Sequence, residues 1–181
     1  LEVFLEEFDS VAATLAEQVP LWTQKQSDVS LVTIIRRGFH TLKGSGRMVG
    51  ANEIGDFAWH VEDMLNTLLE GNIKDPDDAI QVVRLSQAVL PAFKSRLQNE
   101  SSWLDAKTIE SIARQANAVT AGEHPDWSSL DSVLPASVAA VLPVELSVIA
   151  GSEGDSTAAT EEPAEPTLKE LVCMELTDNL A

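Results

Sequence analysis

The first 120 residues carry apolar side chains at the spacing of an α-helix, and cap and stop signals divide them into segments. No segment in this part alternates polar and apolar residues as a half-buried strand does. The connections between the predicted helices are short, so neighbouring helices should pack antiparallel. The sequence therefore predicts an all-α fold, an up-down four-helix bundle with an additional helix.

The predicted helices cover about residues 1–19, 28–49, 52–70, 76–98 and 105–121. Pro20 should end the first helix, Gly50 should end the second in a left-handed conformation, and Pro91 should kink the fourth. The expected N-caps are side chains that can accept a backbone N–H bond: Ser27 or Asp28, Asn52, Asp75, and Ser102 or Asp105. We expect this bundle to occupy residues 1–121.

The rest of the chain differs in composition from the bundle. Prolines, serines and acids interrupt every periodic pattern from Gly122 onward, which predicts an irregular acidic linker over residues 122–166. Within it, residues 126–150 could instead pack on the bundle or form a short element of their own. Residues 167–181 become amphipathic again and resemble the start of the chain. They are expected to form a short helix. It could be the first helix of a second, truncated repeat, but two unrelated amphipathic helices would produce the same pattern.

Charge and apolar content exclude several function classes. The net charge is −17, and a strongly acidic chain is a poor partner for nucleic acid or an anionic membrane. The most apolar stretch, residues 133–151, contains two prolines and a glutamate, so no membrane span is expected. Cys173 is the only cysteine, which excludes an internal disulfide and fits the cytoplasm. The start at Leu1 indicates a piece of a longer protein.

The segment "GFHTLKGSGRMVG", residues 38–50, places a histidine on the polar face of the second helix. His40 lies opposite the predicted core face, which is formed by Leu31, Ile35, Gly38, Leu42 and Val49. A neutral imidazole is a good nucleophile. If it accepted a phosphoryl group, neighbouring cations would stabilise the added negative charge, and four flank it here: Arg36, Arg37, Lys43 and Arg47. The alternative is an ordinary solvated histidine.

Two further residues fit this chemistry. Glu62 lies at the edge of the third helix's core stripe, where it could reach His40 and accept its second ring N–H; the stripe is formed by Ile54, Phe57, Ala58, Val61, Leu65 and Leu68. The alternative for Glu62 is a solvated surface charge. Gly44 lies one turn after His40, and its missing side chain would leave room for a partner protein.

The segment "HTLKGSGRMVG" resembles the His-x-x-Lys-Gly-x-x-x-x-x-Gly pattern of histidine phosphotransfer (HPt) domains. His40, Lys43, Gly44 and Gly50 match it, and Glu62 stands where the related domain of CheA-like kinases has a glutamate that contacts the histidine. "GDFAWHVEDMLN" looks like the multi-HPt kinases that control type IV pili and twitching motility. The resemblance covers about residues 1–120. Many chemotaxis kinases have a histidine at the position of Trp59, and the nearby His60 is shifted by one.

The resemblance implies a phosphorelay without a cofactor. The ATP-binding domain of a histidine kinase, within the same parent protein, would phosphorylate His40, and a response-regulator aspartate would take the phosphoryl group. Lys43 and Glu62 would support the histidine. Residues with an implied role in partner access or in the motif itself are Gly44, Gly50, Arg36 and Arg47.

Other functions fit the sequence less well. "GSGRMVG" resembles a dinucleotide-binding loop only weakly, and no strand precedes it. A metal site would need His40, His60 and Glu62 to converge, yet His60 points away from the core stripe. The main alternative is a degenerate HPt-like scaffold that binds kinase or receiver domains without relaying phosphate. The intact histidine, lysine and glycine favour active phosphotransfer.

Overall fold

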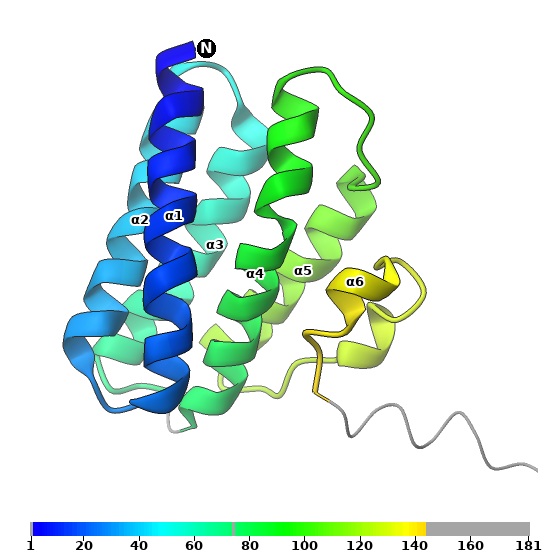
Figure 1. Cartoon of the computed structure of the whole chain (residues 1–181). Coiled ribbons are helices and arrows are strands. Elements are labelled where there is room, and N and C mark those ends of the chain that lie inside the picture. The colour runs from blue at the N-terminus through cyan, green and yellow to red at the C-terminus, as the bar shows by residue number, and fades with distance from the viewer. Residues whose placement is uncertain (1, 74, 144–181) are drawn as a thin grey trace, which may run out of the picture. The chain divides into compact units, whose positions relative to one another are not determined.

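Five long helices and two short ones make up the computed structural model, which describes residues 2–73 and 75–143 (Figure 1). The described residues contain no strand, so the all-α prediction is confirmed. The helices are α1 (Glu2–Gln24), α2 (Val29–Met48), α3 (Asn52–Leu69), α4 (Pro76–Leu97), α5 (Ala106–Thr120), the 3-10 helix η1 (Trp127–Ser129) and α6 (Ala136–Ala139). None of them is long and apolar enough to cross a membrane.

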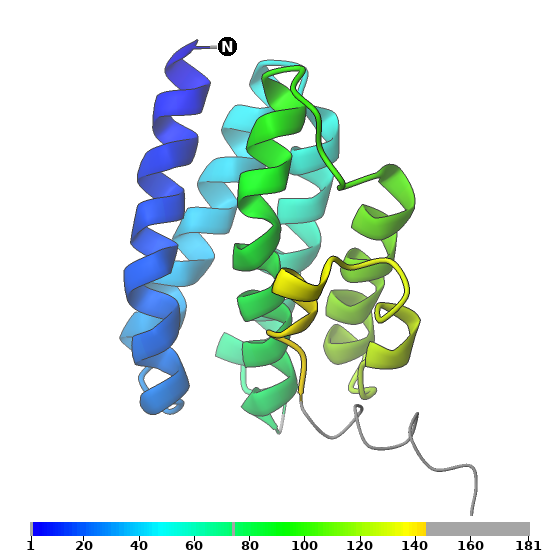
Figure 2. The ribbon, with the colours of Figure 1, turned by 45° about the vertical axis from the view of Figure 1, so that its right-hand side comes forward.

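The first four helices form an up-down bundle. Helix α1 packs against α2 and α4, and α3 packs against the same two helices, so the four helices enclose one core. Helix α5 lies outside the four and packs against α3 and α4 (Figures 1 and 2). The predicted four-helix bundle with an additional helix is therefore correct.

Local signals fix most helix ends as predicted. Asp28, Asp75 and Asp105 are the N-caps of α2, α4 and α5, and each carboxylate accepts a backbone N–H bond from the first turn. The Ser102 hydroxyl instead donates to the carbonyl of Ala92. Gly50 follows α2 with a φ of 79°, the left-handed conformation that glycine adopts without a steric cost.

Two predicted helix ends are wrong. Helix α1 continues through Pro20 to Gln24, because the last turn is held by Trp22, which is fully buried and donates its indole N–H to the carbonyl of Gln26. Proline removes one intrahelical bond there, and burial of the indole compensates. Asn52 is the first residue of α3 rather than its cap, because Ala51 occupies the cap position without a side-chain bond.

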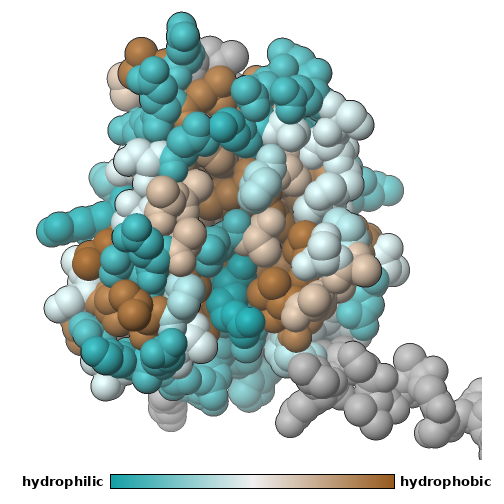
Figure 3. Space-filling view, in the orientation of Figure 1, coloured by the Kyte–Doolittle hydropathy of each residue, from teal (hydrophilic) through white to brown (hydrophobic). Residues whose placement is uncertain are grey.

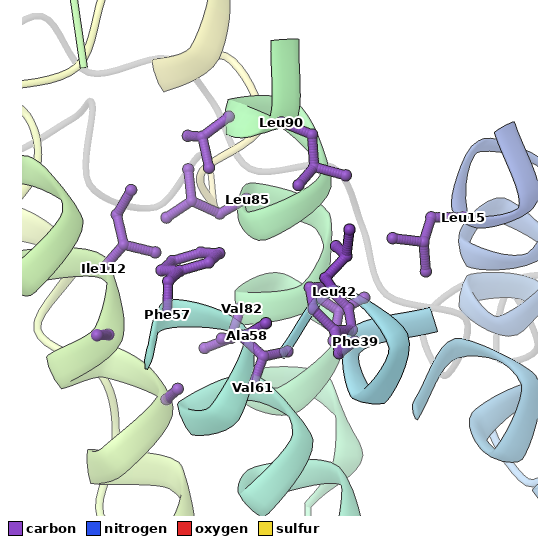
Figure 4. Close-up of a cluster of buried hydrophobic side chains, with 14 of the residues drawn as sticks. Leu15, Phe39, Leu42, Phe57, Ala58, Val61, Val82, Leu85, Leu90 and Ile112 are labelled. Atoms are coloured by element: carbon purple, nitrogen blue, oxygen red, sulfur yellow. The ribbon is translucent and has the colours of Figure 1, made fainter. Parts of the chain in front are cut away.

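The core lies between the four helices and continues toward α5 (Figure 4). Phe39 and Leu42 of α2 point into it, and Phe57 of α3 packs on Phe93 of α4 with 5.0 Å between ring centroids. The predicted core face of α2 is wrong at Val49, which is 42% exposed because the helix ends at Met48. The buried residues of α2 are Val32, Ile35, Gly38, Phe39, Leu42 and Gly46.

The first part of the predicted linker over residues 122–166 packs on the bundle, which is one of the alternatives left open for residues 126–150. The apolar side chains of residues 122–143 recur every three or four residues and are buried in the same core, at Trp127, Leu130, Leu134, Val138 and Leu142. The Gln115 side chain of α5 accepts the backbone N–H of Asp126, which holds the segment in place. Helix α6 packs against α4 (Figure 2). Residues 144–166 and the predicted helix over 167–181 lie outside the described residues.

Candidate functional site

His40 lies on the outer face of α2, where the helical wheel predicts it. Its side chain is 61% exposed, whereas the neighbouring Phe39 and Leu42 are buried. These two core residues fix the rotation of α2 about its axis, so the imidazole is held at the surface by the packing of the opposite face. The ring is thus accessible to a partner protein.

Glu62 of α3 contacts the His40 ring from the buried side of the site. Glu62 is only 4% exposed, and its Oε1 lies 2.8 Å from His40 Nδ1. An ionised carboxylate only accepts hydrogen bonds, so Nδ1 must carry the proton and donate it. In the neutral ring, Nε2 then holds the free electron pair. The contact therefore selects the tautomer whose free electron pair lies on the nitrogen remote from Glu62, where it can act as a nucleophile.

Two cations compensate the buried carboxylate. Lys43 Nζ lies 2.7 Å from Glu62 Oε2, which is itself buried, and Arg36 Nη1 lies 3.7 Å from Oε1. Burial alone would raise the pKa of Glu62, but contact with Lys43 and His40 more than offsets this and lowers the pKa below the ordinary 4.5. Glu62 is consequently ionised at neutral pH and keeps its role as an acceptor.

A groove runs beside His40 between α1 and α2. Its volume is about 480 Å³, and its lining includes Val3, Phe4 and Glu7 of α1 together with His40 and Gly44 of α2. A Cβ added to Gly44 would meet no atom within 4 Å. Gly44 thus leaves open space one turn from the imidazole.

Comparison with known proteins assigns the family. The family described as "Hpt domain" matches residues 1–106, which is more than half of the chain. The chain belongs to the Hpt domain family. It is also similar to chemotaxis protein CheA of Rhizobium meliloti (strain 1021), with 24% identity over 177 residues, covering 94% of this chain and 23% of that protein. Chemotaxis protein CheA of Borreliella burgdorferi (strain ATCC 35210 / DSM 4680 / CIP 102532 / B31) is 28% identical over 116 residues, covering 64% of this chain and 13% of that protein.

The Hpt domain is therefore related to CheA chemotaxis kinases. The chain spans less than a quarter of the length of these two relatives. No solved structure matches it.

Two glycines of the Hpt domain bring α2 and α3 close together near the site. A Cβ on Gly46 would lie 3.1 Å from Ile54 Cγ2, and one on Gly55 would lie 2.8 Å from Arg47 Cγ and 3.3 Å from the Lys43 carbonyl oxygen. Sequence reasoning missed Gly55, although a glycine inside a predicted amphipathic helix is itself an indication of close packing. This close approach lets the short Glu62 side chain reach His40 and Lys43.

The remaining predicted residues of the Hpt domain lie away from Glu62. Arg47 pairs with Asp56 at 2.8 Å, and Gly50 terminates α2. His60 packs against Trp59 with the two rings tilted by 59°, and its Nδ1 lies 2.8 Å from Asn117 Oδ1 of α5, so it does not join His40. Within residues 2–73 and 75–143, no three His, Cys, Asp or Glu side chains are placed to hold a metal ion.

Proposed function

We propose that this Hpt domain is an active phosphorelay carrier and that His40 is its phosphoacceptor. The observation that carries the proposal is the exposed imidazole whose Nδ1 lies 2.8 Å from the buried Glu62 carboxylate. An exposed ring with Nδ1 engaged offers Nε2 to a partner. The partners would be the ATP-binding domain of a histidine kinase and the receiver domain of a response regulator.

The proposed transfer proceeds in two steps. The Nε2 electron pair attacks the γ-phosphorus of ATP held by the kinase domain, the N–P bond forms, and the bond from phosphorus to the bridging oxygen breaks as ADP leaves. The ring becomes cationic and retains its Nδ1 proton. The Nδ1–H group then donates a charge-assisted hydrogen bond to the Glu62 carboxylate. A receiver aspartate then attacks the phosphorus, the N–P bond breaks, and His40 returns to the same neutral tautomer.

Neighbouring residues support both steps. Lys43 keeps Glu62 ionised through the 2.7 Å ion pair, so the carboxylate remains an acceptor throughout the cycle. Gly44 leaves one side of the imidazole open, and the groove beside it provides apolar surface for a partner. We assign Gly44 to partner access, Gly50 to the helix end that completes the motif, and Arg47 to the α2–α3 ion pair with Asp56.

A phosphorylation assay tests the proposal and separates it from the scaffold alternative. The protein is incubated with a chemosensory kinase core and ATP, and an acid-labile, base-stable phosphoryl group is measured. We expect label on the wild-type protein and none on His40→Gln. An unlabelled but kinase-binding wild-type protein would instead indicate a docking scaffold.

His124 provides a matched control. Its Nδ1 lies 2.6 Å from Asp78 Oδ2 and its side chain is 87% exposed, so it has the carboxylate contact of His40. Among the described residues, however, Asp78 has no lysine or arginine ion-pair partner. We expect His124→Gln to be labelled like the wild type. Label that survives in His40→Gln and disappears with His124→Gln would refute the assignment.

We further propose that the parent protein is a cytoplasmic multi-HPt kinase that controls type IV pili and twitching motility. Support comes from "GDFAWHVEDMLN", residues 55–66, in which Trp59 occupies the position where many chemotaxis kinases have a histidine. In the native host, His40→Gln in the parent protein should abolish pilus-dependent surface spreading and leave flagellar swimming intact. Loss of chemotactic swimming with normal twitching would refute this assignment.

A further inference from the structure

Arg36 lies one helical turn before His40 and shares its carboxylate partner. Arg36 Nη1 is 3.7 Å from Glu62 Oε1, the oxygen that accepts the His40 Nδ1 proton, while Lys43 holds Oε2. Residues 36, 40 and 43 are spaced at four and three positions, so they line one face of α2. The Glu62 carboxylate thus pairs with one cation from the turn before His40, Arg36, and with another from the turn after it, Lys43.

We propose that Arg36 is a positioning residue for phosphoryl transfer, which acts through Glu62 to hold His40 in the neutral form that can attack. The inference rests on the proposed phosphoacceptor role of His40. Only the unprotonated Nε2 has an electron pair to donate, so a proton on this nitrogen prevents attack.

Both acidic and basic side chains surround His40. Glu62 faces the ring from α3 and Glu7 lines the same groove from α1, and both acids favour a doubly protonated ring. Lys43 and Arg36 of α2 oppose them by neutralising Glu62. Without Arg36, two carboxylates would face one lysine, and the ring would take its second proton at a higher pH.

Arg37 supplies a matched control for this effect. It is the next residue on α2, it is exposed, and among the described residues it makes no ion pair. Arg36→Gln and Arg37→Gln therefore remove the same positive charge from adjacent positions. Only Arg36→Gln removes a cation that pairs with Glu62. Arg36→Lys keeps the charge and should restore wild-type behaviour.

The experiment measures initial phosphorylation rates from pH 5.5 to 8.5, with phosphoramidate as donor. This small donor needs no partner protein: the phosphoryl group moves to His40 Nε2 as the donor P–N bond breaks and ammonia leaves. Dividing each variant's rate by the wild-type rate at the same pH cancels the donor's own ionisation. Ring-nitrogen NMR follows the titration of His40, with His60 and His124 as internal references.

We expect the acid side of the pH–rate profile of Arg36→Gln to lie roughly 0.5 pH unit higher than that of the wild type. The ratio of the variant's rate to the wild-type rate should then be about one third at low pH and near one at high pH. The NMR midpoint of His40 should move by the same amount. A structural defect alone would lower the rate equally at every pH. A flat ratio with an unmoved midpoint, or an equal shift in Arg37→Gln, would overturn the proposal.

The two proposals fail in different ways. If the wild-type protein takes no label but Arg36→Gln still moves the NMR midpoint, the phosphoacceptor role fails and the coupling between Arg36 and His40 stands. If the wild-type protein is labelled and the midpoint does not move, the phosphoacceptor role stands and the assignment of Arg36 fails.

Discussion

The same methyl group should have opposite effects on stability at two helical glycines, Gly44 of α2 and Gly55 of α3. Gly44 lies within α2, is exposed, and has open space where a Cβ would be. Glycine costs about 1 kcal/mol relative to alanine inside a helix. Gly44→Ala should therefore stabilise the domain by up to about 1 kcal/mol, since nothing opposes the gain.

Gly55→Ala meets two obstacles. Its Cβ would lie 2.8 Å from Arg47 Cγ and 3.3 Å from the carbonyl oxygen of Lys43, so α2 must shift or the Arg47 side chain must move. Overpacking of this kind costs about 1 to 3 kcal/mol, against the same helix gain of about 1 kcal/mol. The net change should be a loss of up to about 2 kcal/mol. Because the displaced carbonyl belongs to Lys43, phosphorylation of His40 should also slow.

Chemical denaturation followed by circular dichroism measures both changes, and phosphoryl exchange with a receiver domain is measured on the same samples. A third variant, Gly44→Gln, should keep the wild-type stability and exchange phosphate much more slowly, because its side chain occupies the space beside His40. Destabilisation by Gly44→Ala would refute the conclusion that the space beside Gly44 is open. Native exchange by Gly44→Gln would refute the role of Gly44 in partner access.

Three further predictions concern Glu62 and the segment after α5. Glu62→Ala should slow phosphorylation at least tenfold while helicity is retained, since His40 loses its tautomer-fixing acceptor; an unchanged rate would reduce Glu62 to a structural charge. Because the folded-state pKa of Glu62 is lowered from 4.5, its stabilising contribution is complete above that pH and is lost as the pH falls through the folded-state value. Glu62→Gln should remove this part of the acid dependence of unfolding, and an identical pH profile would contradict the lowered pKa. Trp127→Ala should destabilise the domain by about 3 kcal/mol, because the indole is buried in the bundle core; a change below 1 kcal/mol would show that the segment contributes little.

Features decided by neighbouring residues could be predicted from the sequence. Asp28, Asp75 and Asp105 cap their helices through bonds to residues two or three positions ahead, so local sequence is sufficient. The exposed position of His40 follows in the same way from the periodicity of α2. The periodicity of α3 likewise places Glu62 at the edge of the helix's core stripe, and the observed contact with His40 fits that placement. The role of Glu62 in phosphotransfer stays a prediction.

Features decided by packing between distant segments could not be predicted. Pro20 ends a helix by its own preference, but burial of Trp22 extends α1 past it. Burial of Trp127 likewise orders a stretch whose composition is typical of a linker. Gly55 matters because of Lys43 and Arg47 on another helix, a contact that the sequence pattern does not contain.

The division of the site between two helices links its chemistry to folding. His40 belongs to α2 and its acceptor Glu62 to α3, so the ring proton is held only while these helices are correctly packed. A phosphorylated ring is cationic and binds the carboxylate more strongly than a neutral one. By thermodynamic linkage, phosphorylation should raise the free energy of unfolding, and whatever tightens the α2–α3 contact should shift the phosphorylation equilibrium toward the phosphohistidine. A partner that loosens this contact would thereby shift the equilibrium toward transfer of the phosphoryl group away from His40.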